Sequence, residues 1–208
     1  MFAFFDLDYK LPRLAKYGIC LSTVLFASVA QAWVLAVTPG PRAVYLAVGN
    51  ATQNANNATV NLVSVTVPAN AVGTGAAQTM QSNSTQANSP FDNFNVCVPS
   101  LGQVYIGGFF RLPAASATTA VLQVNTPAAL TSGANTIPFN QISWTSTALG
   151  NAAADIPAGT FPSGGTLVLR NFAANSYVEN CHTFLYANNV LVRAGTYSGV
   201  ATYTLTAP

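Results

Sequence analysis

The chain has 208 residues, of which 50% are hydrophobic and 6% charged, and its formal net charge at pH 7 is +2. This balance argues against nucleic-acid and anionic-membrane partners, because both are bound through clustered positive charge. A surface with so little charge also repels its own copies weakly, which favours self-assembly. A neutral polar surface with no such role is the alternative.

A secretory signal peptide is predicted for residues 1–32. This segment has three basic residues, Lys10, Arg13 and Lys16, before an apolar run over residues 17–29, and it ends in a small-x-small cleavage site at Ala30-Gln31-Ala32. The pattern predicts export from the cell.

Residues 33–208 are then the exported chain, whose length suits a single domain. It has four arginines and three acidic residues, which leaves a net charge of +1. No stretch in it approaches the roughly 20 apolar residues of a transmembrane helix, so no membrane span is expected. Cys20 is expected to leave with the signal peptide.

The first predicted strands lie at residues 42–50, which are apolar on both faces, and at residues 59–68, which are rich in β-branched side chains. Together they predict a hairpin. Residues 69–90 contain Gly, Ala, Ser, Asn, Gln and Thr without an apolar period, which predicts a long polar surface loop.

Short apolar segments separated by Pro, Gly and Ser turn signals predict the remaining strands. They are centred near Cys97, Ile106, Leu122, Ile142, Leu169 and Phe184, and the last one runs over residues 194–208.

The predicted fold is all-β, an antiparallel Ig-like sandwich of about nine strands in one domain. Only residues 126–130 and 148–154 are candidates for a helical turn. The Gly107-Gly108 pair inside a strand predicts either a bulge or a close approach of two backbones.

The terminal strand places Tyr197, Tyr203 and Leu205 on one face, with threonines and a serine between them. Two interpretations remain open. The strand closes the sheet of its own molecule, or it edges a sheet that takes a strand from another molecule.

Cys97 and Cys181 are the two cysteines of the exported chain, and an even count in an exported protein predicts a disulfide. The bond requires Cα atoms within about 7 Å, so the segments around the two residues are expected to be neighbours. Two separate buried thiols are the alternative.

The sequence offers little reaction chemistry. His182 is the only histidine, and no nucleophile motif accompanies it. A zinc or copper site needs several His, Cys or carboxylate ligands, so we expect no catalytic residue, metal or cofactor. Trp144 is a candidate aromatic for stacking on a ligand such as a glycan, although an aromatic residue on a strand is more often part of the core.

The signal peptide, single disulfide, many short strands, scarce charge and final AGTYSGVATYTLTAP together resemble bacterial pilus-subunit sandwiches, namely chaperone-usher pilins and spore-coat-U-like domains. In these families each sandwich lacks a strand, and an amino-terminal extension of the next subunit supplies it. The resemblance implies a donor strand with Trp33, Leu35 and Val37 on one face, and an acceptor edge at the terminal strand.

We therefore expect a non-enzymatic structural or adhesive protein, secreted through the periplasm to the cell surface. Its partners would be copies of itself or other surface subunits, with a periplasmic chaperone before assembly. The alternative is a secreted binding module with a self-complete sandwich and a glycan or protein ligand.

Overall fold

The computed structural model describes residues 35–50, 61–98, 102–113, 118–147 and 153–208. Within them the chain is all-β and its strand pairs are antiparallel, and these residues contain no α-helix. The predicted antiparallel β-sandwich is confirmed. The count of about nine strands is not, because the described residues contain several strands of only two residues.

The elements, in chain order, are β1 (Leu35–Ala36), β2 (Ala43–Val48), β3 (Val63–Ser64), η1 (Ala69–Ala71), β4 (Gln78–Thr79), β5 (Gln81–Ser82), β6 (Gln103–Arg111), β7 (Thr119–Thr126), β8 (Ala129–Ser132), β9 (Asn135–Pro138), η2 (Phe139–Gln141), β10 (Ile142–Thr147), β11 (Gly159–Thr160), β12 (Gly165–Ala173), β13 (Ser176–Tyr186) and β14 (Thr202–Thr206), where η marks a 3₁₀ turn.

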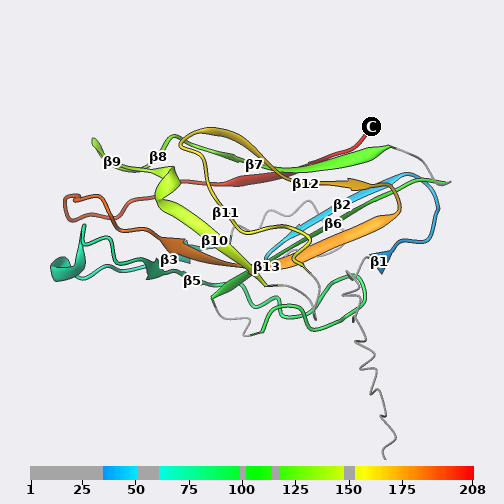
Figure 1. The fold of residues 1–208 in the computed structure, drawn as a ribbon, viewed down its shortest axis with the longest axis horizontal. Coiled ribbons are helices and arrows are strands. Elements are labelled where there is room, and N and C mark those ends of the chain that lie inside the picture. The colour runs from blue at the N-terminus through cyan, green and yellow to red at the C-terminus, as the bar shows by residue number, and fades with distance from the viewer. Residues whose placement is uncertain (1–34, 51–60, 99–101, 114–117, 148–152) are drawn as a thin grey trace, which may run out of the picture.

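Two sheets form the layers of the sandwich. The larger has the order β11-β10-β13-β6-β2, and the smaller has the order β12-β7-β14. In Figure 1 the smaller sheet lies above β2, β6 and β13. Two further pairs, β3 with β5 and β8 with β9, stand outside these sheets.

β13 organises the larger sheet because its two halves pair with different strands. Residues 176–180 pair with β6, and residues 181–186 pair with β10 on the other side. β1 and β4 occupy the two places that remain, one at each end of β13. This strand therefore contacts four others and lies at the centre of the fold.

Strand alternation divides the apolar side chains between two clusters. Val178 and Phe184 of β13 face the main core between the sheets, whereas Tyr177 and Cys181 face away from the smaller sheet. The second cluster on that outer face is covered by residues 91–97 and by Val37.

The Gly107-Gly108 pair is a site of close approach. A Cβ on Gly107 would lie 2.2 Å from the Tyr105 hydroxyl oxygen, and one on Gly108 would lie 2.8 Å from the Tyr45 carbonyl oxygen. The register of β6 is unbroken on both sides, so of the two predicted alternatives the structure has the close approach.

Three local predictions are wrong. β2 pairs with β6 and β3 pairs with β5, so residues 42–50 and 59–68 form no hairpin with each other. No strand forms at Cys97, where the nearest pairing is the isolated bridge of Asn88 with Asn95. Residues 129–132 form β8 of a hairpin instead of a helical turn, and most of the other candidate turn, residues 148–152, lies outside the described residues. For β2 and β3 the partners are other strands, and at Cys97 the disulfide to β13 fixes a segment that forms no ladder.

Residues 69–90 are more ordered than the predicted polar loop, since they contain η1, β4 and β5. Distant polar groups hold them. The side-chain carbonyl of Asn188 accepts the Gly73 N–H at 3.0 Å, and its amide donates to the Ala71 carbonyl at 2.7 Å. Hydrogen bonds of this kind leave no apolar period in the sequence.

Candidate functional site

Two edge strands, β2 and β14, lie on the same side of the sandwich. β2 ends the larger sheet and β14 ends the smaller, and among the described residues no further strand pairs beyond either. The two strands contact each other across the layers. Arg42, just before β2, donates to the carbonyls of Ala207 and Pro208, just after β14, at 3.1 and 3.0 Å. The start of β2 therefore lies beside the end of β14.

Apolar side chains along these two edges are incompletely covered. Leu46 and Val48 on β2, and Tyr203 and Leu205 on β14, pack against the main core but are only half buried. Val44, on the same face of β2, is 40% exposed. These five side chains are termed the open seam. The seam offers apolar area that an added segment would bury.

The opposite side of the sandwich is built differently. The register of β12 shifts between Val168 and Arg170, which marks a bulge, and Arg170 brings a charge to this edge strand. β11, beside it, has only two residues. Bulges, charges and short strands all prevent an edge from pairing with another chain. β14 has an unbroken five-residue register and contains no charged residue, so its edge is the less protected one.

The expected donor segment is paired within its own chain. β1, which contains Leu35, pairs with the first two residues of β13. The N–H of Val37 donates to the Asn175 carbonyl at 2.9 Å, and the Val37 side chain is 5% exposed. Trp33 lies outside the described residues. A donor role would require this segment to leave β13.

The terminal strand is shorter than predicted. Tyr203 and Leu205 lie on β14, at the edge of the smaller sheet. Tyr197 precedes β14, and its hydroxyl donates to the Arg193 carbonyl at 2.9 Å. Residues 194–201 contribute only the isolated bridge of Ser198 with Thr131.

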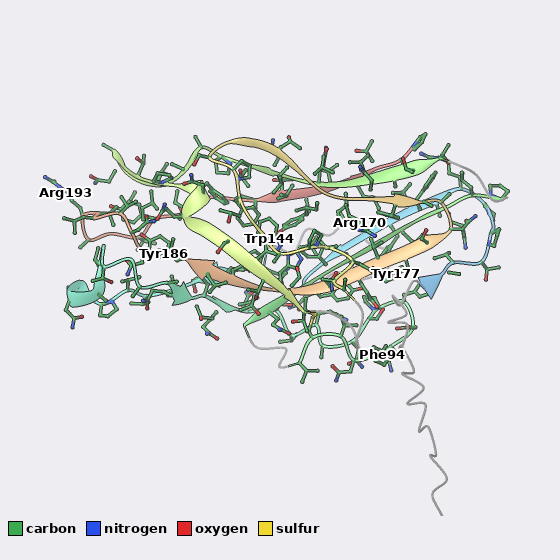
Figure 2. All side chains as sticks on the ribbon, in the orientation of Figure 1. Phe94, Trp144, Arg170, Tyr177, Tyr186 and Arg193 are labelled. Carbon is green, nitrogen blue, oxygen red and sulfur yellow. A yellow bond between two sulfur atoms is a disulfide. The ribbon has the colours of Figure 1, made fainter. Side chains whose placement is uncertain are left out.

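Cys97 and Cys181 form the predicted disulfide, with their Cα atoms 5.4 Å apart. The bond fastens the irregular segment before residue 98 to the outer face of β13. Phe91 of this segment stacks on Tyr177, with ring centroids 4.6 Å apart. Figure 2 shows Phe94 on the side of β13 away from β7 and β12, where it is 54% exposed.

A buried carboxyl group lies beneath this segment. Glu179 is 4% exposed, and its Oε2 accepts the hydroxyl of Tyr105 at 2.6 Å. The hydroxyls of Tyr105 and Tyr177 are also 2.6 Å apart. Burial raises the pKa of Glu179, and hydrogen bonds from Tyr105 and Ser89 partly offset the rise. Burial likewise raises the pKa of both tyrosines. The three groups and Ser89 form a buried hydrogen-bonded network.

His182 and Trp144 lie together in the main core. His182 is 1% exposed and stacks on Trp144 with ring centroids 5.6 Å apart. Burial lowers the pKa of His182 to about 3, so the ring is neutral at physiological pH. Neither ring nitrogen has a hydrogen-bond partner among the described residues. This histidine is enclosed by the core.

Trp144, the expected ligand aromatic, is 3% exposed, and Figure 2 shows it between the two layers. Its indole N–H donates to the Pro157 carbonyl at 3.0 Å, and its ring also packs on Phe161. Trp144 contributes to the lining of a cavity of about 200 Å³ beside β11 and β12. Its ring faces are occupied by core contacts in this structure.

No protein-family model, curated protein or solved structure matches the chain. Within the described ranges, no group of three or more His, Cys, Asp or Glu side chains could hold a metal ion. In the same part of the chain, no helix is long and apolar enough to cross a membrane.

Sequence reasoning missed three features of this region: the position of β2 as the opposite edge of the seam, the contact of Arg42 with the end of β14, and the Glu179 network. Each joins residues far apart in the chain, such as Arg42 and Pro208. The one available signal was the half-apolar alternation of residues 194–208.

Proposed function

We propose that the protein is an exported, non-enzymatic structural component of the bacterial surface that joins neighbouring subunits by β-strand addition at the β14 edge. One observation carries the proposal: an unprotected edge strand lies beside an apolar seam that is half exposed. An added strand would supply main-chain partners to β14 and would cover seam side chains such as Val44 and Leu205.

The donor in this proposal is the segment from Trp33 to Val37 of a neighbouring copy or of another surface subunit. Its alternate residues Trp33, Leu35 and Val37 share one face of an extended strand and could bury that face in the seam. Within the described part of its own chain, the segment is held by the two-residue strand β1 and by the contacts of Val37. A periplasmic chaperone would cover the seam before assembly.

Export through an oxidising compartment is supported by the disulfide between Cys97 and Cys181 and by the signal-peptide pattern of residues 1–32. A structural role for the single histidine is supported by the enclosure of His182 in the core.

The test is size-exclusion chromatography with negative-stain microscopy on oxidised protein that begins at Trp33, compared with protein that begins at Arg42. Rods or ladders are expected only from the longer chain. Because the shorter chain also loses β1, Thr204→Lys in the longer chain serves as the matched control. Thr204 is exposed on β14, and a lysine there should block edge pairing without disturbing the core.

If the longer chain remains monomeric at concentrations at which fibre subunits assemble, the proposal is wrong. Rods that persist in Thr204→Lys would show that subunits join at another surface.

A further inference from the structure

Arg42 joins the two edges of the seam at one end. Its Nε donates to the Pro208 carbonyl at 3.0 Å and its Nη2 donates to the Ala207 carbonyl at 3.1 Å. Arg42 belongs to the larger sheet's edge, and its two acceptors directly follow the smaller sheet's edge strand. The Arg42 side chain thus connects the two layers at their β2 and β14 edges, which belong to different sheets.

The turn that presents Arg42 is itself fixed. The N–H of Gly40 donates to the Leu112 carbonyl at 3.0 Å, and Nε of Arg111 donates to the Pro41 carbonyl at 3.1 Å. Both contacts attach the turn to the end of β6. The Arg42 side chain therefore extends from a fixed base, and its planar fork suits two neighbouring carbonyl oxygens.

These carbonyls lie where a strand added along β14 would run past its last residue, Thr206. The guanidinium occupies main-chain acceptors at the end of the edge that an added strand would approach. Both hydrogen bonds are exposed, so water competes for them and the contact can open.

We propose that Arg42 is a latch that holds the end of β14 against the β2 edge and slows the addition of a strand at the seam. The inference rests on the proposed function, because it assigns a regulator to the same edge. Opening the latch would free both the Ala207 and Pro208 carbonyls and the adjoining part of the seam, near Leu205. Arg42 is a positioning residue in this scheme, since it would act on the incoming strand through β14.

Two measurements on the oxidised exported chain test this latch. Hydrogen exchange reports how firmly residues 202–207 are held. Fluorescence anisotropy reports the association rate of a labelled synthetic peptide with the sequence WVLAVT, residues 33–38. Arg42→Ala removes the guanidinium group, and Arg42→Lys keeps the positive charge without the two planar donors. Arg193→Ala is the charge-matched control, because Figure 2 shows Arg193 at the far end of the molecule from the C-terminus marked in Figure 1.

We expect Arg42→Ala to speed both exchange over residues 202–206 and peptide association by roughly fivefold, which corresponds to the loss of about 1 kcal/mol of hydrogen bonding. Arg42→Lys should fall between Arg42→Ala and wild type. Arg193→Ala should match wild type in both measurements.

The outcomes separate the latch from strand addition itself. Unchanged exchange in Arg42→Ala overturns the latch. Faster exchange with an unchanged peptide rate also overturns it, because the contact would then be structural only. Faster exchange with no peptide binding to any variant overturns the proposed strand addition and, with it, the role of Arg42 in slowing it.

Discussion

Gly107 shows how one residue without a side chain shapes the outer face of the larger sheet. It lies directly opposite Glu179 in the register, and the Tyr105 hydroxyl occupies the space that a Cβ would fill. The phenol can therefore reach across and donate to the Glu179 carboxyl group. A buried acid is costly without such partners, so the glycine and the tyrosine together make Glu179 tolerable.

His182 gives a prediction at the same scale. Its folded pKa of about 3 is depressed below the ordinary value of 6.5, so the unfolded chain takes up a proton that the folded chain refuses. The contribution of His182 to stability is therefore complete above pH 6.5 and is lost as the pH falls towards 3. The slope is at most about 1.4 kcal/mol per pH unit.

The contribution of Glu179 to stability changes with pH in the opposite direction. Its folded pKa is raised, so its contribution is present at low pH and is lost as the pH rises through the folded pKa. Urea titrations of wild type and His182→Phe across pH 3 to 7 separate the two groups, because Glu179 is common to both proteins. We expect the acid loss attributable to His182 to vanish in the variant. Parallel stability curves would contradict the enclosed, neutral histidine.

At the scale of elements, the disulfide attaches an irregular segment to β13 and does not join two strands. It closes a sequence separation of 84 residues. On the chain-entropy model, Cys97→Ala with Cys181→Ala should lower the free energy of unfolding by about 4 kcal/mol. Denaturant unfolding of oxidised wild type and the double variant measures this difference. A loss below about 1 kcal/mol would mean that contacts such as Phe91 on Tyr177 order the segment without the bond.

The sequence predicted the elements whose pattern is local and long. The strands at Ile106, Leu122 and Leu169 follow from short apolar segments between turn signals, and the disulfide follows from the cysteine count and the expected compartment. Residues 69–90 were harder, because side-chain hydrogen bonds from Asn188 order them. The short strand β1 also left no signal, since two residues carry no period.

One of the two strands of the candidate site, β14, could be predicted because its pattern is local. The alternation of Tyr203 and Leu205 indicated a half-buried strand at the carboxyl end, and its place at a sheet edge was one of two interpretations. Nothing local indicated that β2 is the facing edge, because that position depends on which strands pair with β6 and β13. The contact of Arg42 with Pro208 depends in turn on both edges being in place.

The whole molecule is a sandwich with two unlike sides. On one side β12 carries a bulge and Arg170, and β11 is short, which protects the edges. On the other side β14 is regular and uncharged, and the seam beside it is half exposed. In a chain with so few charges, we propose that this asymmetry directs association to the β14 side, which accepts a strand.

The most direct test of that claim is disulfide trapping between copies. One preparation carries Ala36→Cys in the expected donor, and the other carries Thr204→Cys on β14 or, as the control on the protected side, Thr166→Cys on β12. All three positions are exposed. After mixing and mild oxidation, non-reducing electrophoresis should show a heterodimer with Thr204→Cys and none with Thr166→Cys. Equal trapping at both positions, or none at Thr204→Cys, would contradict strand addition at the β14 edge.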